Sequence, residues 1–449
     1  MGMTTGPEPD ESAAARPARL MRVLGVGFGV AVGVGSIIGA GILRSPGDVA
    51  AQLPVPWLFF SVWLIAGSYA LLGANSLSEI GTMLPRSGGQ YVYAQHALGP
   101  YAGFLVGWTD WIATCGSTAA VTIVIAESFG ALFPPVASHV AIIGAAIVFL
   151  FSALLWRGAH TSDRAQRITS SIKALGFLAL IGACFVLGGD RGGPQPAVLH
   201  APAGLSLVAA FVVALQGVIF AYDGWTGVIY FSEEMRDPGR QIPRAMFGGL
   251  LSVMAIYLLI NAAFLYVLPI SVMASSKLVA ATAARQLFGA HGDVVVRALI
   301  IVALPSAVTA NLLMASRVVF SMGRDRLATH AAAGVNERGT PTVALLLTTV
   351  CTVLFVLTGT YETVIALLAF FFVATYGISF ASVFILRRRE PDAPRPYRAW
   401  GHPWTTGLVL AGSIAFLVAA IASDTRNSLY ALILLVTSYP VFLVMRRTV

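Results

Sequence analysis

Two hydrophobic segments of the sequence are interrupted by glycine, and the interruptions expose backbone groups that can bind a ligand. The first contains GSIIGAGI at residues 35–42, and the second contains FAYDGWTG at residues 220–227. Glycine weakens a helix and lets its backbone unwind. An unwound helix frees N–H groups at one end and carbonyl groups at the other, which can bind a carboxylate and an ammonium. Paired interruptions in two membrane segments therefore predict a binding site at membrane depth.

The glycines of the first interruption have two interpretations. Gly35 and Gly39 have the spacing of small residues at a close contact between membrane helices. Because the second segment is interrupted in the same way, we favour unwinding, with an outer half-helix that begins near Ala40. The N–H groups and the dipole at that helix start would bind a carboxylate.

The second interruption holds an acid, Asp223, next to Gly224. A charge in the middle of a membrane segment is functional by default. Asp is also a preferred N-cap, so Asp223 could instead cap the half-helix that follows. The sequence leaves both roles open. The neighbouring Phe220 and Trp225 either pack in the core or close the site.

Lys173 is one of only two lysines and lies in the hydrophobic run SIKALGFLALIGA. A buried ammonium requires polar partners, so one interpretation is a fixed cation with a coupling or structural role. The other is a side chain that extends to the nearby cytoplasmic face.

Four other charged residues lie in or near hydrophobic segments. We expect Glu79 to lie at the inner interface and Asp110 to pair with a polar neighbour. We expect Arg44 to face an outer vestibule and Glu127 to lie near an outer end. The mixed charges at residues 232–245 predict a cytoplasmic network of ion pairs.

These residues must be positioned by membrane helices. The chain has 449 residues, of which 57% are hydrophobic and 11% charged, whereas soluble proteins carry about 25% charged residues. The composition predicts an all-α membrane protein with twelve transmembrane segments near 22–43, 54–79, 97–130, 137–156, 168–188, 205–232, 245–268, 294–322, 342–358, 363–386, 406–423 and 428–445.

Segments 1 and 6 are the interrupted ones, so each would begin a unit of five segments. Because five is an odd number of crossings, the second unit would enter the membrane from the opposite side and be inverted. We therefore predict a 5+5 inverted repeat within a transmembrane domain at 21–449. Repeat one covers about 22–188, repeat two about 205–386, and helices 11 and 12 about 404–446. Residues 1–20 are polar and read as a disordered cytoplasmic tail.

Most of the 28 Lys and Arg residues fall into the loops that share one side of the membrane with both termini. This asymmetry predicts that both termini are cytoplasmic, and it explains the net charge of +8 without nucleic acid. The three cysteines fall inside predicted segments and form no disulfide or metal pattern. We expect no metal, no cofactor and no catalytic residues, since no nucleophile–base set is present.

Several motifs occur in order along the chain: GSIIGAGI, PRSGGQYVYAQHALGPYAGFLVGW, FAYDGW followed by EEMRDPGRQIPRA, and RPYRAWGHPW. From about Arg22 to its end, the chain resembles the amino acid–polyamine–organocation (APC) transporters. Within that superfamily it is most similar to the L-type amino acid transporters and the bacterial serine/threonine exchangers.

The resemblance implies a LeuT-like fold of twelve helices in which helices 1 and 6 are broken. It implies that a substrate carboxylate meets the backbone of Gly39, Ala40 and Gly41. The ammonium would meet groups at Ile37, Phe220, Ala221 and Asp223. The resemblance also makes Phe220 a candidate gate, and it places Lys173 where related transporters carry a lysine in place of a sodium ion.

The chain departs from the family pattern at two positions. The family often has Ser or Thr where this chain has Ala40, and an apolar residue where it has Arg44. Animal L-type transporters use a cysteine in the third outer loop to bond a partner subunit, and ESFGALFPPVASH has none. We therefore expect no disulfide-linked heavy subunit.

The sequence predicts a sodium-independent secondary transporter of amino acids in the plasma or inner membrane, working by alternating access. Small neutral amino acids moved by exchange or proton coupling are favoured. A cationic amino acid or polyamine antiporter is an alternative, which we rank lower because Asp223 is the one candidate anion near the site. A nutrient sensor that binds without transport remains open, and an ion channel would not need two broken helices.

Overall fold

A computed structural model describes residues 25–448 apart from 87, 158–161, 189–199, 337–338 and 360. The predicted tail at 1–20 lies outside the described residues. Within them the regular structure is helical. The helices are α1 (Val26–Ile37), α2 (Ala40–Gln52), α3 (Pro56–Met83), α4 (Gln90–Leu98), α5 (Pro100–Leu132), η2 (Pro134–His139), α6 (Val140–Trp156), α7 (Ser162–Leu187), α8 (Leu205–Tyr222), η4 (Gly227–Glu234), α9 (Pro238–Val267), α10 (Ile270–Ala274), α11 (Val279–Phe288), α12 (Ala290–Ala303), α13 (Pro305–Arg324), η5 (His330–Ala333), α14 (Thr342–Thr358), α15 (Tyr361–Arg389), α16 (Trp404–Ser423) and α17 (Thr425–Thr448).

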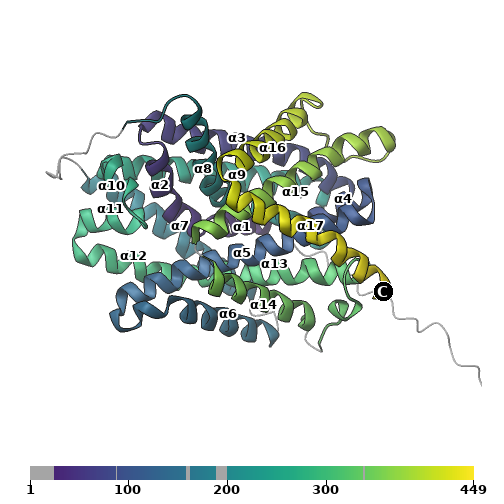
Figure 1. Ribbon diagram of the computed structural model, residues 1–449, viewed down its shortest axis with the longest axis horizontal. Coiled ribbons are helices and arrows are strands. Elements are labelled where there is room, and N and C mark those ends of the chain that lie inside the picture. The colour runs from purple at the N-terminus through teal and green to yellow at the C-terminus, as the bar shows by residue number, and fades with distance from the viewer. Residues whose placement is uncertain are drawn as a thin grey trace, which may run out of the picture.

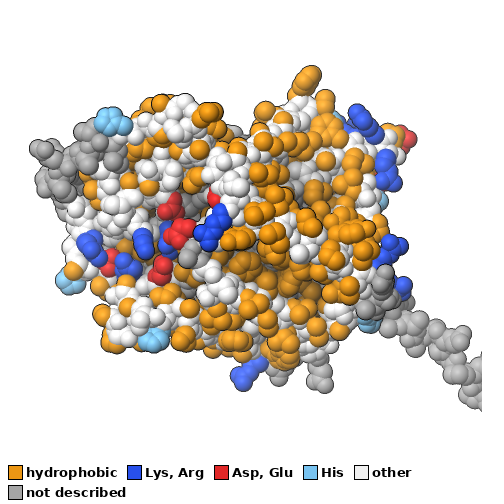
Figure 2. All heavy atoms as spheres, in the orientation of Figure 1, with side chains coloured by type: hydrophobic (Ala, Val, Ile, Leu, Met, Phe, Trp, Pro, Cys, Tyr) orange, Lys and Arg blue, Asp and Glu red, His pale blue; other side chains and the backbone are white. Residues whose placement is uncertain are grey.

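Much of the surface suits a lipid environment. In the described part of the chain, nine helical stretches are long and apolar enough to cross a bilayer, and Ser171–Leu187 and Thr342–Thr358 are shorter apolar helices. Large hydrophobic side chains are exposed on α6, α7, α14, α16 and α17. Figure 2 shows hydrophobic side chains over much of one face, with charged side chains in a cluster left of its centre and along its right edge. The chain is therefore a multi-pass membrane protein.

Both predicted interruptions are present as breaks between helical segments. α1 ends at Ile37, Ile38 and Gly39 have non-helical backbone angles, and α2 begins at Ala40, the predicted residue. α8 ends at Tyr222, and the chain resumes as the 3-10 helix η4 only at Gly227. Gly224 has a φ of +99°, a left-handed conformation that glycine adopts without steric cost.

The two broken segments run antiparallel to each other, and α1 lies near the centre of the helical bundle (Figure 1). α2, which follows the first break, packs against α8, which precedes the second, and α1 packs against η4. They approach closely at Gly41, where an added Cβ would lie 2.5 Å from the Ala221 Cα. Only a glycine lets the two backbones come this close, so the breaks are fixed against each other.

At the end of α3, the structure corrects the expectation that Glu79 is interfacial. Glu79 is 1% exposed, and both its carboxylate oxygens accept hydrogen bonds from Arg387, at 2.8 and 2.6 Å. Arg395 adds an ion pair at 3.2 Å, and the Ala399 N–H donates to the same carboxylate at 2.7 Å. The RPYRAWGHPW segment is thus bound to the end of α3 by one buried carboxylate. The sequence analysis did not predict this pairing, because Glu79 and Arg387 are 308 positions apart.

Replacing Glu79 with alanine is expected to destabilise the protein strongly, because it leaves Arg387 and Arg395 without their anion. Breaking a buried ion pair in this way costs roughly 3–5 kcal/mol. The measurement is the thermal unfolding midpoint in detergent, with Arg388→Gln as a control because Arg388 is exposed on the same helix end. Equal midpoints for Glu79→Ala and Arg388→Gln would show that the network does not hold the loop.

Candidate functional site

A small cavity of about 30 Å³ lies where the two breaks meet. Its lining comes from both breaks and from α5, η4, α13 and α15. Six of the seven predicted binding residues line it: Ile37, Gly39, Ala40, Gly41, Phe220 and Asp223. Ala221 does not line it, because this residue packs against Gly41. The structure therefore brings together the two segments that the sequence analysis paired.

The start of α2 offers unoccupied donors to the cavity. Its N-cap is Gly39, and no side chain caps it. The first N–H groups of a helix have no partner within the helix, so those after Gly39 are available to an anion. An added Cβ at Gly39 would meet nothing closer than the Ile37 carbonyl oxygen at 3.9 Å, which leaves the space beside this backbone open.

Two carboxylates, Asp223 and Asp110, line the same cavity. Asp223 accepts a hydrogen bond from the Tyr376 hydroxyl at 2.9 Å. It does not occupy the N-cap position of η4, which is Thr226. Asp110 accepts a hydrogen bond from the Tyr230 hydroxyl at 2.6 Å, which confirms the expected polar neighbour. The sequence-based argument that the site has one candidate anion is therefore wrong, because α5 brings Asp110 to it.

Lys173 lies behind the first break and does not extend to the membrane surface. Its side chain is 2% exposed. Its ammonium donates hydrogen bonds to the carbonyl oxygens of Gly35 at 3.0 Å and Ile38 at 3.3 Å. Both carbonyls belong to the last turn of α1 and the break, where helix carbonyls lack partners within the helix. The lysine thus satisfies backbone groups that the break exposes.

Sequence reasoning missed Tyr257 of α9. Its side chain is fully buried, and its hydroxyl lies 2.8 Å from the Ile37 carbonyl oxygen and 2.8 Å from the Ala221 carbonyl oxygen. One hydroxyl therefore bridges the last residue of α1 and a residue near the end of α8. In the sequence Tyr257 stands in an apolar run, where a tyrosine is usually a packing residue, so no signal singled it out.

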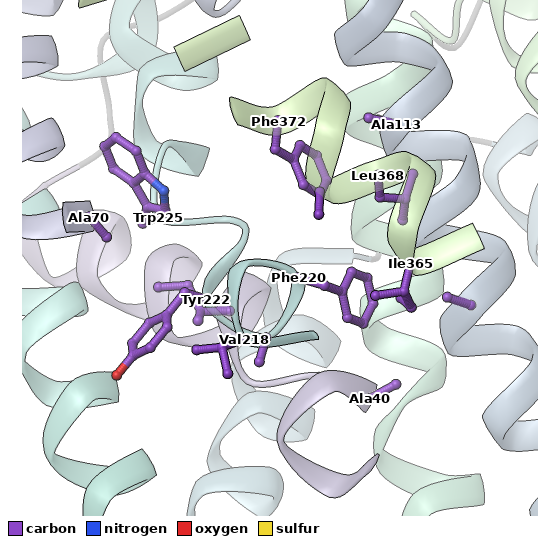
Figure 3. Close-up of a cluster of buried hydrophobic side chains, with 14 of the residues drawn as sticks. Ala40, Ala70, Ala113, Val218, Phe220, Tyr222, Trp225, Ile365, Leu368 and Phe372 are labelled. Carbon is purple, nitrogen blue, oxygen red and sulfur yellow. The ribbon is translucent and has the colours of Figure 1, made fainter. Parts of the chain in front are cut away.

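Aromatic side chains close one side of the cavity. In Figure 3 the Phe220 ring lies next to Ile365, with Ala40 below it. Its other neighbour is Tyr361, in an edge-on contact with ring centroids 6.1 Å apart. Above Tyr361 lies the Arg44 guanidinium, 4.1 Å from the ring centroid.

Arg44 links three helices above this aromatic pair. It forms ion pairs with Glu127 of α5 at 2.7 Å and with Glu362 of α15 at 2.9 Å. It lines a hollow of about 540 Å³, in accord with a vestibule, but it is itself only 3% exposed. Charged side chains gather in this hollow at the left of Figure 2. Arg44 therefore forms a floor between the hollow and the aromatic pair.

In the part of the chain that the structure describes, no group of three or more His, Cys, Asp or Glu residues could hold a metal ion. The arrangement offers helix N–H groups, break carbonyls and two carboxylates, which are suited to binding a charged small molecule.

The family model "Amino acid permease" matches residues 26–442. The "Serine/threonine exchanger SteT" of Bacillus subtilis is 28% identical over 436 residues, which cover 95% of this chain and 98% of that protein. The human "Large neutral amino acids transporter small subunit 2" is 29% identical over 404 residues, covering 87% and 74%. The human "b(0,+)-type amino acid transporter 1" is 26% identical over 428 residues, covering 93% and 86%.

Proposed function

We propose a substrate class and a mode of coupling for this chain, which belongs to the amino acid permease family. The chain is a membrane transporter of amino acids and not an enzyme. Our proposal is that it moves small neutral amino acids by alternating access, without sodium. The observation that carries it is the cavity between the two helix breaks, which is lined both by the uncapped start of α2 and by Asp223. The relative named as a serine/threonine exchanger supports the same substrate class.

The substrate carboxylate binds the uncapped N–H groups at the start of α2, around Gly39, Ala40 and Gly41. The ammonium binds on the opposite side, at Asp223 and the Phe220 carbonyl. The carbonyls of Ile37 and Ala221 share the single hydroxyl hydrogen of Tyr257. Ala221 is a weaker candidate ligand than its neighbours, because it does not line the cavity. Ala40 supplies no hydroxyl, so the carboxylate is held by backbone alone.

Sodium independence rests on Lys173. Its ammonium occupies the place where a cation would meet the carbonyls of the first break. A covalently attached cation satisfies these carbonyls in each step of the cycle, so transport requires no sodium ion. Lys173 has this coupling role without touching the substrate cavity.

The proposal also includes the membrane topology of the whole chain. The antiparallel contacts of the broken segments support a 5+5 inverted repeat, with repeat one at about 22–188 and repeat two at about 205–386. Helices 11 and 12 at about 404–446 complete twelve transmembrane segments. Both termini are cytoplasmic, and the protein lies in the plasma or inner membrane. It works without a disulfide-linked heavy subunit, since the three cysteines lie within α5, α7 and α14.

We expect Phe220 to act as the gate over the substrate. Phe220→Ala should accelerate dissociation of bound substrate from purified protein about tenfold or more, because the cavity loses the ring that covers it. Phe220→Trp and Phe220→Tyr should retain slow dissociation, since a flat ring remains. The measurement is release of radiolabelled substrate in detergent. An unchanged rate in Phe220→Ala would remove this residue from the gate.

The proposed function is tested with a radiolabelled amino acid panel in proteoliposomes in sodium-free buffer. Each amino acid is measured with and without internal substrate, and with and without a pH gradient. We expect saturable uptake of serine, threonine or alanine. Binding without uptake would indicate a sensor, and strict sodium dependence would contradict the role of Lys173.

A cationic amino acid or polyamine is the second candidate substrate. The observation that favours it is Asp110, which adds a second carboxylate to the cavity. Preferential uptake of lysine or putrescine in the same panel would decide for this alternative.

A further inference from the structure

The central cavity contains more negative charge than a neutral amino acid can balance. Asp110 and Asp223 both line it, and no Lys, Arg or His among the described residues does. A buried charge is costly unless it is paired. A zwitterion brings one ammonium and one carboxylate, so its binding leaves the excess of two negative charges unchanged. One of the two carboxylates must therefore be neutralised in another way.

The two carboxylates differ in their position relative to the helix breaks. Asp223 accepts a hydrogen bond from the Tyr376 hydroxyl at 2.9 Å. It also lies at the break where the ammonium is expected. Asp110 is 6% exposed, and its Oδ2 accepts from the Tyr230 hydroxyl at 2.6 Å. Among the described residues, no hydrogen bond to its Oδ1 is present. Asp110 belongs to α5 and to neither break, so it is the carboxylate left without the cation that the substrate supplies.

We propose that Asp110 is the proton-binding residue of the transport cycle and that one proton crosses with each amino acid. The inference rests on the proposed function and defines its coupling. The proton joins Oδ1 of Asp110, while Oδ2 continues to accept from Tyr230. Asp223 then pairs with the substrate ammonium, and the N–H groups of α2 hold the substrate carboxylate. When the cavity opens to the other side, the proton leaves Oδ1 for water.

The other groups around Asp110 do not compete for this proton. Tyr230 of η4 and Tyr376 of α15 are phenols, which in ordinary surroundings ionise near pH 10. Thr114 and Ser117 of α5 and Asn311 of α13 also line the cavity and carry no charge. The Lys173 ammonium is bound to α1 carbonyls and does not line the cavity. Asp223 is the other titratable group, and the ammonium keeps it ionised.

The experiment measures protons and substrate together in sodium-free proteoliposomes. An enclosed pH-sensitive dye records proton entry while radiolabelled L-serine records uptake. We expect about one proton per serine in the wild type and a ratio near zero in Asp110→Asn, whatever its uptake rate. Asp392→Asn is the matched control, because Asp392 is an exposed acid outside the cavity, and its ratio should stay near one.

A wild-type ratio of zero, or an unchanged ratio in Asp110→Asn, would overturn the inference. Lysine or putrescine uptake that exceeds serine uptake would also overturn it, because a cationic ligand would then balance the second carboxylate. If Asp110→Asn does not fold, Asp110→Glu decides: a displaced pH profile of uptake supports the inference, and an unchanged profile contradicts it. Serine counterflow without proton entry would refute the coupling alone, whereas absence of any counterflow would refute the proposed function.

Discussion

Lys173→Ala is expected to reduce sodium-free uptake at least ~10-fold. The variant removes an ammonium that donates to the carbonyls of Gly35 and Ile38 at 3.0 and 3.3 Å. A hydrogen bond to a charged group contributes roughly 1.5–3 kcal/mol, and about 1.4 kcal/mol corresponds to a factor of ten. Without these donors the end of α1 loses its fixed position, so the carboxylate site at the start of α2 is misplaced. Initial uptake rates of radiolabelled serine provide the measurement.

The chain offers a matched control, because its other lysine, Lys277, is exposed. Lys277→Ala removes the same charge from the protein and should leave uptake unchanged. If sodium restores uptake in Lys173→Ala, an ion can occupy the vacated position, which would support the substitute-cation role directly. Full activity of Lys173→Ala in sodium-free buffer would contradict that role.

Gly41→Val is expected to abolish transport, with Gly41→Ala already strongly impaired. The added Cβ would lie 2.5 Å from the Ala221 Cα and 3.1 Å from its backbone nitrogen, so the two breaks must separate. Overpacking of this kind costs roughly 1–3 kcal/mol even where side chains can adjust, and here the neighbouring atoms are backbone.

Two other glycines of the same segment provide controls for Gly41. Gly33→Ala meets only the Gly249 Cα at 3.8 Å, an ordinary contact, so it should retain both folding and uptake. Gly39→Ala has open space around the new methyl group and should keep the thermal stability of the wild type while raising KM. Uptake kinetics, thermal midpoint and gel-filtration profile are compared across the three. Wild-type KM and kcat in a well-folded Gly41→Val protein would show that the close approach is not needed.

The sequence predicted the parts of the site that local chemistry determines. The start of α2 at Ala40 follows from the glycines of GSIIGAGI, because their low helix propensity reduces the free-energy cost of a break at that point. For Lys173 the sequence left two interpretations open, and the structure shows the fixed cation, because a buried ammonium needs acceptors and a break exposes them. The second break was also predicted from a glycine, Gly224, which stands beside a buried acid.

The parts that could not be predicted depend on which helices become neighbours. Asp110 reaches the cavity because α5 packs beside both breaks, and nothing in GWTDW indicates that packing. Tyr257 bridges the two breaks from α9, yet in the sequence it is one aromatic residue among many. Glu79 was expected at an interface because its partner Arg387 is more than 300 positions away. In each case the residue type indicated what kind of partner was needed, but the sequence did not indicate which residue would be that partner.

The attachment of the Lys173 ammonium to the protein has an electrical consequence. A sodium ion that crosses with its substrate carries charge through the membrane potential, which is worth about 2.3 kcal/mol per elementary charge per 100 mV. A lysine side chain cannot leave the protein, so its charge returns with every cycle and contributes nothing to net current. The membrane voltage therefore cannot drive accumulation through this position. Exchange of one zwitterion for another would be electrically silent, and a current would report only the proton on Asp110.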